Sequence, residues 1–546
     1  MVVVGRGLRC FGGVVSSGAD PASFSFAGSF FASFRCFLPK YLSAMLETLA
    51  GIGRFILILF EVILIFNLMI VVHEYGHFLA ARWRGLKIEK FQIWFGKAII
   101  KKEINGVQWG LGTIPLGGFV ALPQMAPMDA IEGKEDDGKE VLPKISPMDK
   151  IIVAFAGPLF SFGLAFLFAC LVWTLGKPER ASNVTTYIGY VQTDSPAELA
   201  GLLEGDRVVS IDGTAIRNFR TPVDSVVERV MFSQNEIMDW VVERDGKEIA
   251  LKVGYEKIAI PGSRRAPIRT VGVGPQEPAI VGQFMAVDVK GGTPAEIAGF
   301  KIGDVIKRVD GETVHSYGHF GKFVKASDGK EITVEVERGG ETMTLKLTPK
   351  KPTFDKPLET DDEIPFMAGI VQQAPDDLAL TKPGPKPMVQ MRDSLTMMFR
   401  TLGGLFSSKS DISPTHMSSA VGIANIYFKM LSDPQYGWLM AIWFSVLLNV
   451  NLAILNLLPF PVLDGGHITI AIMEAVRRRP VNVRILEYVQ MVCVLALFGF
   501  MLFVTFFDAT DIFGGKKKDR GPPPKASFST SAEAPSSPEK EAPAAP

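Results

Sequence analysis

The sequence predicts a polytopic α-helical membrane protein, with four transmembrane helices and two extracytoplasmic α/β domains between the second and third helices. Three observations predict this class. They are four long apolar runs, an internal repeat between the second and third runs, and a composition in which 47% of the 546 residues are hydrophobic. The formal net charge is zero, which gives no reason to expect nucleic acid or an acidic partner. The four cysteines show no CxxC spacing, so we expect neither a disulfide scaffold nor a cysteine-bound metal.

Each of the four apolar runs is long enough to cross a bilayer, which takes roughly 20 residues. They cover residues 54–74, 151–175, 437–458 and 486–507. With the segments between them, we expect helix 1 within 45–84, a cytoplasmic-side loop at 85–150, helix 2 at 151–175, a linker with an amphipathic segment at 351–436, helix 3 within 437–480 and helix 4 at 486–507.

The two ends of the chain have unusual compositions. Residues 1–44 are basic and rich in Ser and Phe, with Asp20 as their single acid. A targeting segment has such a composition, but we favour a misplaced start codon, because Met45 begins a natural short lead into helix 1. Residues 508–546 are rich in Pro, Ala, Ser and Lys, and we expect a disordered tail there.

Lysine and arginine predict the orientation, because cytoplasmic loops carry an excess of both. The basic stretches "ARWRGLKIEKFQ", "KISPMDK" and "EAVRRRPVNVR" follow helix 1, precede helix 2 and follow helix 3. Their agreement predicts that 176–436 and both termini lie on the opposite, extracytoplasmic side. The stretch "GGKKKDR" after helix 4 favours the reverse orientation, but the three other basic stretches agree with one another and carry more weight.

An internal repeat lies in this extracytoplasmic region. "SPAELAGLLEGDRVVSIDGTAI" (195–216) aligns without a gap with "TPAEIAGFKIGDVIKRVDGETV" (293–314). Each copy predicts a short helix, a Gly-Asp turn and strands joined by an Asp-Gly hairpin. The copies, at 183–257 and 271–350, resemble circularly permuted PDZ domains, which are a β-sandwich or partly open barrel with helices. PDZ domains bind extended peptides at a sheet edge; a structural spacer is the alternative.

The stretch "VVHEYGHFLAAR" (71–82) ends the first apolar run and carries the HExxH pattern. His73 and His77 lie on one face of a predicted helix, about 40° apart, so both imidazoles can bind one zinc ion. Glu74 can reach a water beside that ion and take its proton. A pair of buried, hydrogen-bonded histidines is the alternative reading of so short a pattern.

A catalytic zinc needs a third protein ligand. Asp464 in "NLLPFPVLDGGHITI" is the best candidate, because a carboxylate after such an apolar stretch needs a reason, and His467 is a rival. The pair Gly465-Gly466 allows a tight turn behind Asp464. Pro459 and Pro461 break the helix before it.

"HEYGH" together with "NLLPFPVLDGG" is similar to the site-2 protease family of intramembrane zinc metalloproteases. The stretches "IEKFQIWFGKAI", "IPLGGFVAL" and "FAGPLFSF" and the two PDZ-like repeats resemble its bacterial regulator-of-sigma-E branch. The resemblance covers roughly residues 45–507. Three positions depart from the family's pattern: Ser161 stands for Asn, Trp94 for Gly, and "SSAVGIA" fits a GPxGIA stretch loosely.

The resemblance implies one zinc ion per chain, held by His73, His77 and Asp464, with Glu74 as general base. It implies that Asn456 helps to hold the substrate. It also implies that 95–120 is a membrane-dipping β-hairpin that pairs with an unwound substrate, and the alternating "KAIIKKEI" suits a strand-accepting edge.

The resemblance further implies a metalloendopeptidase of regulated intramembrane proteolysis in the bacterial inner membrane, with its active site near the cytoplasmic face. Its substrates would be single-span membrane proteins such as an anti-sigma factor, already cut once by another protease, and remnant signal peptides. A PDZ-bearing membrane scaffold without catalysis is the alternative, and a metal transporter or sensor is a third class.

Overall fold

The computed structural model describes residues 26–125, 145–285, 292–354, 364–373, 378–479, 481, 483–513 and 526–528. The chain divides into two compact units, Met1–Glu61 and Val62–Pro546, and the described part of the first unit is the beginning of helix α1. Residues 1–25 of the questioned extension, and 514–525 and 529–546 of the predicted tail, lie outside the described residues.

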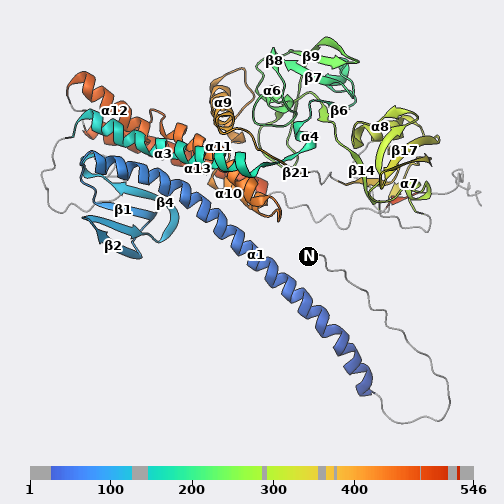
Figure 1. Ribbon diagram of the computed structural model, residues 1–546, viewed down its shortest axis with the longest axis horizontal. Helices are drawn as coiled ribbons and strands as arrows, with labels where there is room; N and C mark the ends of the chain where they lie inside the picture. Colours follow the sequence, from blue (N-terminus) through green and yellow to red (C-terminus); the bar gives the residue numbers. More distant parts are fainter. Residues whose placement is uncertain are drawn as a thin grey trace, which may run out of the picture. The chain divides into compact units, whose positions relative to one another are not determined.

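Four helices of the described chain are long and apolar enough to cross a membrane, as the apolar runs predicted (Figure 1). The helices are α1 (Phe26–Trp83), α3 (Pro147–Leu175), α11 (Gly437–Asn456) and α13 (Val483–Phe513). Helix α3 starts at a capping box in which Ser146 and Asp149 satisfy each other's backbone N–H groups. It packs against both α11 and α12 (Asp464–Arg477).

The stretch 437–480 forms two helices, separated by the break that Pro459 and Pro461 predicted. Helix α11 ends at Asn456, a turn follows, and α12 begins at Asp464. Pro459 and Pro461 lie in the break and lack the N–H that a continuing helix requires. The break therefore turns the backbone and places Asp464 at the start of a new helix.

A four-stranded sheet follows α1. Its strands are β1 (Lys90–Phe95), β2 (Ile100–Ile104), β3 (Val107–Leu111) and β4 (Ile114–Ala121), in the order β2-β3-β1-β4. The expected hairpin at 95–120 is thus part of a larger sheet with two different edges. The strand from "KAIIKKEI", β2, forms one edge, and β4 forms the other.

Aromatic contacts fix this sheet against α1. The ring centre of Phe91 on β1 lies 5.6 Å from the ring centre of Phe78 on α1. It lies 4.7 Å from the ring centre of Trp109 on β3. Trp94 has φ of 69°, a conformation that glycine adopts easily and other residues rarely do. Its indole N–H donates to Asn67 Oδ1 on α1 at 2.5 Å, which gives the tryptophan a function at a position suited to glycine.

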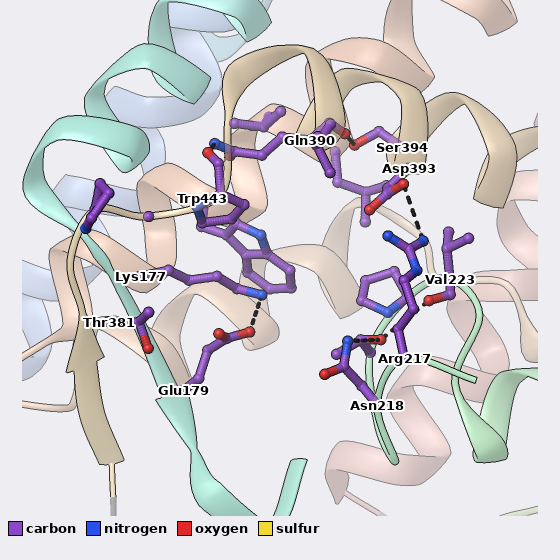
Figure 2. Close-up of a pocket in the computed structure, with 18 residues that line it drawn as sticks. Lys177, Glu179, Arg217, Asn218, Val223, Thr381, Gln390, Asp393, Ser394 and Trp443 are labelled. Atoms are coloured by element: carbon purple, nitrogen blue, oxygen red, sulfur yellow. Dashed lines mark hydrogen bonds and ion pairs between the residues drawn. The ribbon is translucent and has the colours of Figure 1, made fainter. Parts of the chain in front are cut away.

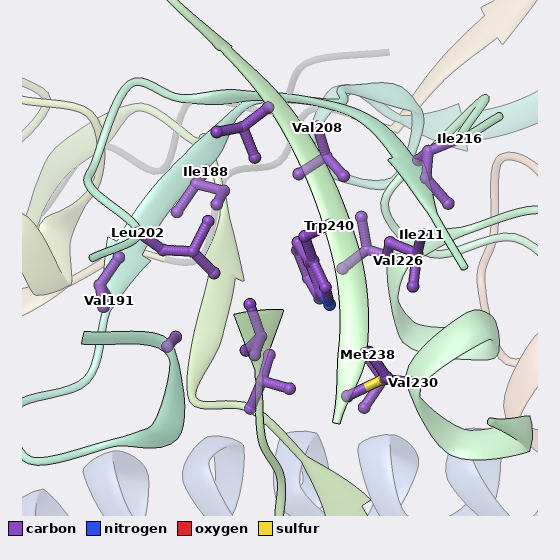
Figure 3. Close-up of a cluster of buried hydrophobic side chains, with 14 of the residues drawn as sticks. Ile188, Val191, Leu202, Val208, Ile211, Ile216, Val226, Val230, Met238 and Trp240 are labelled. Atoms are coloured by element: carbon purple, nitrogen blue, oxygen red, sulfur yellow. The ribbon is translucent and has the colours of Figure 1, made fainter. Parts of the chain in front are cut away.

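The two repeats share one order of elements. Repeat 1 contains β6 (Ile188–Val191), α5 (Pro196–Leu199), β7 (Arg207–Ile211), β8 (Thr214–Ala215), α6 (Val226–Phe232), β9 (Met238–Arg244), β10 (Lys247–Val253) and β13 (Val273–Pro275). Repeat 2 contains β14 (Ala279–Phe284), α7 (Pro294–Ile297), β15 (Val305–Val309), β16 (Glu312–Thr313), α8 (Tyr317–Ala326), β17 (Ile332–Arg338), β18 (Glu341–Leu347) and β20 (Ile370–Gln372). In repeat 1 the buried Trp240 of β9 lies among aliphatic side chains from both sheets and α6 (Figure 3).

Both repeats extend past the ends expected from the sequence. Strand β13 pairs with β6, and β20 pairs with β14, so repeat 1 closes after residue 257 and repeat 2 after residue 350. Each closing strand has only three residues. Such a short strand carries too little alternation to be recognised in the sequence.

The repeats also share their stabilising contacts. Arg244 donates to Asp206 in repeat 1, and Arg338 donates to Asp304 in repeat 2, each at 2.7 Å. Burial alone would raise the pKa of Asp304, but the hydrogen bonds from the Arg338 guanidinium hold that pKa below its ordinary value. The same pair of a buried aspartate and a partly exposed arginine therefore braces the same turn in both copies.

Repeat 1 is bound to the segments that surround the apolar helices. Arg265 donates to Asp508 and Asp511 of α13, at 2.7 and 2.5 Å. Arg400 donates to Glu228 of α6 at 2.6 Å. The remaining elements are η1 (Pro123–Met125), β5 (Lys177–Arg180), α4 (Ala181–Val184), β11 (Glu256–Ile258), β12 (Ile268–Thr270), β19 (Thr353–Phe354), β21 (Leu378–Thr381), α9 (Pro387–Phe406), η2 (Pro414–His416), α10 (Ala420–Leu431) and β22 (Ala526–Ser527).

Part of the segment expected to be disordered, 508–546, is ordered. Helix α13 continues to Phe513, and Asp508 on it is buried and paired with Arg265. Strand β22 pairs with β19, which follows repeat 2. This segment is ordered because Asp508 and Asp511 pair with Arg265, which lies far away in the sequence.

Candidate metal centre

The two histidines of the HExxH pattern lie on one face of α1, near its C-terminal end. The side chains of His73 and His77 are buried, and their Nε2 atoms are 3.3 Å apart. One helical turn separates them, which is why both can point at the same place.

Asp464 is brought to this place by the break between α11 and α12. Its Oδ2 lies 3.2 Å from His73 Nε2, and its Oδ1 lies 3.4 Å from His77 Nε2. The three candidate ligand atoms lie within 4.8 Å of one another. Within the described chain, no other group of at least three His, Cys, Asp or Glu residues is arranged in this way.

The hydrogen bonds behind the histidines determine what the site can hold. His77 Nδ1 lies 2.8 Å from the carbonyl oxygen of Val153, and His73 Nδ1 lies 3.0 Å from Ser161 Oγ. Since a carbonyl only accepts, His77 Nδ1 carries the proton and its Nε2 presents a lone pair. We assign the same tautomer to His73, with the Ser161 hydroxyl oxygen as acceptor.

The converging atoms are therefore two nitrogen lone pairs and a carboxylate. Asp464 Oδ2 is buried and receives no hydrogen bond from the described residues. Three acceptor atoms that lie within 4.8 Å of one another, with no proton between them, form a site suited to a bound cation. Two imidazoles and one carboxylate form a donor set that zinc prefers at catalytic sites, where a further position stays open.

Helix α3 shapes the space around this site through one of its faces. Val153, Gly157 and Ser161 follow one another at helical spacing, and the outer two hold the histidine rings. A Cβ atom on Gly157 would lie 2.2 Å from His77 Nε2 and 2.9 Å from His73 Nε2. Glycine at this position therefore leaves the room that the converging nitrogens need.

Glu74 lies beside the three ligand candidates and faces the sheet. It lines the same cavity of about 830 Å³ as His73, His77 and Asp464. A Cβ atom on Gly118 of β4 would lie 3.7 Å from Glu74 Cγ, so the carboxylate stem runs along this strand. Among the described strands β4 pairs only with β1, and its other edge is open.

Asn456 and His467 both line the cavity that contains the three candidate ligands. The amide nitrogen Nδ2 of Asn456, at the end of α11, lies 3.2 Å from His73 Nε2. His467 lines the cavity and is 7% exposed, but it does not belong to the group of three converging residues. The geometry thus favours Asp464 over its rival His467 as third ligand.

Sequence reasoning did not find the supporting face of α3. Ser161 was noted only as a departure from a family pattern, and the spacing of Val153, Gly157 and Ser161 was not recognised. The signal was available in "FAGPLFSF", since a glycine inside an apolar helix often marks a close approach by another group. The segment expected to pair with a substrate, 95–120, includes β2 and most of β4, and of these two edge strands β4 borders the cavity.

Comparison with known proteins shows that the chain is similar to metalloproteases. The model of peptidase family M50 matches residues 61–500. A protein of Neisseria meningitidis serogroup A that is named as a zinc metalloprotease is 29% identical over 466 residues, which is 82% of this chain and 98% of the relative. The regulator of sigma-E protease RseP of Salmonella typhimurium is 26% identical over 474 residues, covering 85% and 99%. Protease RseP of Yersinia pestis is 25% identical over 468 residues, covering 81% and 96%.

Proposed function

The chain belongs to peptidase family M50 and is a zinc metalloprotease of the membrane, and from this premise we propose that it cleaves the membrane-spanning segments of single-span proteins. One observation carries the proposal: two imidazole nitrogens and a carboxylate converge at the end of an apolar helix, beside a glutamate. We propose His73, His77 and Asp464 as the ligands of a single zinc ion per chain.

The side chains around the site then have distinct roles. Bound zinc supplies Lewis acidity, which polarises a carbonyl group and makes a water acidic near neutral pH. Glu74 takes a proton from the attacking water and delivers it to the leaving amine. Asn456, whose amide nitrogen lies 3.2 Å from His73 Nε2, donates its N–H to the substrate carbonyl in this proposal. Val153 and Ser161 keep the histidine nitrogens directed at the centre.

The substrate must unwind before it can be cut. A transmembrane helix satisfies its own backbone groups, so its amides are hidden from attack until it is extended. The open edge of β4 supports a simple solution, because an extended segment can pair with that strand and pass Glu74 and the ligand residues.

The likeness to proteins named for regulating sigma-E supports an anti-sigma factor as one substrate. Another protease would first shorten such a substrate outside the membrane, and remnant signal peptides are a second substrate class. We place the chain in the bacterial inner membrane, with the metal centre near the cytoplasmic face. We place the two repeats, as PDZ-type domains, on the periplasmic side.

The experiment that tests this function is Glu74→Gln in the full-length protein. We expect cleavage of a single-span substrate to be lost while one zinc ion per chain is retained, because the carboxylate is a base and not a ligand. Glu103→Gln, an exposed acid on β2, is the matched control and should leave cleavage unchanged.

Two outcomes would count against the proposal. Unchanged cleavage in Glu74→Gln would remove the general base from the mechanism. Unchanged signalling in cells that carry the variant would favour a scaffold that acts through its repeats. Accumulation of uncut single-span proteins in those cells is the result that supports proteolysis.

A further inference from the structure

A second cavity of about 330 Å³ lies at the other end of α3 from the metal centre. The metal cavity reaches Val153 and the second cavity begins at Lys177, just after the helix ends at Leu175. From Val153 to Leu175 the helix rises about 33 Å. This length is close to the ~30 Å thickness of a bilayer's hydrocarbon core, so the end of the cavity at Lys177 lies at headgroup level on the opposite face. Val446 and Leu447 in the middle of α11 continue the cavity toward the bilayer interior.

The walls of this cavity differ in character. Helix α9 contributes Gln390, Asp393 and Ser394, and β5 and the repeat 1 loop contribute Lys177, Glu179 and Arg217 from the facing side (Figure 2). Helix α11 adds an apolar wall of Trp443, Val446 and Leu447. The cavity is thus polar on two sides and apolar along the helix that spans the membrane.

The charges at this cavity balance. Lys177 Nζ lies 2.5 Å from Glu179 and 4.5 Å from the centre of the Trp443 ring. Arg217 lies 3.6 Å from Asp393 across the cavity, and it also donates to Asp224, behind the cavity wall, at 2.8 Å. Two cations and two anions favour an occupant that carries both signs over one that carries a single charge.

Gln390 provides an independent observation. It is 6% exposed, and its amide nitrogen donates to the carbonyl oxygens of Ala169 and Pro385 at 3.0 and 2.6 Å. These two bonds fix which end of the amide is the oxygen. That oxygen, Oε1, is buried and has no partner among the described residues. Since an unsatisfied buried acceptor costs about 1–3 kcal/mol, the cavity wall favours a ligand with an N–H group.

We propose that this cavity binds the headgroup of a phospholipid with a primary ammonium group. The ammonium donates to Gln390 Oε1 and to Asp393, and the phosphate faces Lys177 and Arg217. An acyl chain leaves along the apolar wall of α11. A choline headgroup carries the same charges but has no N–H to donate, so the unsatisfied acceptor discriminates between the two.

The test is a lipid titration of the delipidated full-length protein in detergent. Binding is measured by the change in the protein's melting temperature and by native mass spectrometry. We expect a phosphatidylethanolamine to raise the melting temperature saturably and to remain bound as one molecule per chain. Phosphatidylcholine and phosphatidylglycerol should bind at least tenfold more weakly. Glycerophosphoethanolamine, the headgroup without acyl chains, shows how much of the affinity comes from the headgroup alone.

Two variants connect the lipid to the cavity. Gln390→Met removes the acceptor at similar size, together with the two bonds that the amide nitrogen donates to Ala169 and Pro385, and Asp393→Asn removes one charge and keeps the shape. Each should reduce the affinity for phosphatidylethanolamine to the level of phosphatidylcholine, measured against its own lipid-free baseline. Gln435→Met, at an exposed glutamine before α11, is the matched control and should change nothing.

Three results would overturn the assignment. The first is equal binding of the three lipids, and the second is unchanged binding in both variants. The third is a photo-reactive residue at position 389, on the cavity wall, that captures a peptide instead of a lipid. In that case the cavity belongs to a protein substrate.

Discussion

At the scale of single residues, the proposed metal centre depends on groups other than its three candidate ligands. Val153 and Ser161 bind the outer nitrogens of the two histidines, and Gly157 between them leaves space for the inner nitrogens. The three residues share one face of α3, so a shift of this helix would alter both rings together. Two substitutions on this face separate the effects of orientation and of space.

Ser161→Ala removes the hydrogen-bond partner of His73 Nδ1. We expect zinc affinity to fall by roughly 10- to 100-fold, because the ring loses the group that fixes its tautomer and direction. Competition with a zinc chelator measures this directly. Ser161→Asn supplies another acceptor and should restore most of the affinity. Ser445→Ala, at a buried serine of α11 bonded to Tyr427, is the control. Equal affinity in Ser161→Ala and the wild type would show that the hydroxyl is not needed.

Gly157→Ala places a methyl group where the two histidine nitrogens converge. We expect loss of zinc binding, because the added carbon would lie 2.2 Å from His77 Nε2 and the backbone of α3 cannot retreat far. Gly163→Ala on the same helix has nothing within 4 Å of the added carbon and serves as the control. Zinc content after purification, measured by elemental analysis, distinguishes the two. A fully loaded Gly157→Ala protein would contradict the geometry.

At the scale of secondary-structure elements, the position of the sheet against α1 decides where a substrate strand can bind. The aromatic cluster around Phe91 and the bond from Trp94 to Asn67 hold β1 to the helix. Because β4 pairs with β1, the same contacts hold the open edge of β4 beside Glu74.

Trp94 allows this attachment to be tested. Its positive φ disfavours any side chain, and its indole bond to Asn67 offsets that cost. Trp94→Ala keeps the strain and loses the bond, whereas Trp94→Gly loses both. We expect the alanine variant to be less stable than the glycine variant by about 1 kcal/mol. Thermal unfolding of the solubilised protein provides the comparison, and the opposite order of stability would refute it.

At the scale of the whole molecule, three arginines join repeat 1 to the segments around the apolar helices. Arg265 and Arg269 on repeat 1 bind Asp508 and Asp411, and Arg400 on α9 binds Glu228. These contacts connect the repeat to α9, to α13 and to the segment before η2. From this attachment we propose that the repeats control which substrates reach the candidate metal centre.

Removal of both repeats, residues 186–372, tests this control. We expect the shortened protein to keep its zinc and to cleave a single-span substrate that still carries its folded outer domain. The reason is that the metal centre is built from α1, α3 and α12, which lie outside the deletion. Cleavage of trimmed and untrimmed substrates is compared for both proteins. If selectivity stays the same although zinc is bound, the repeats do not select substrates.

Sequence by itself determined the local features of this protein. The four apolar helices, the HExxH face of α1 and the duplicated domain all follow from periodicity and short motifs, which neighbouring residues encode. The tertiary structure decided what lies together across the chain. Asn456 reaches His73 across 383 residues, and α3 fixes the histidine tautomers through Val153 and Ser161. Only packing could also place β4 at the metal cavity and leave Gln390 Oε1 without a partner, because side-chain partners far apart in the chain leave no local pattern.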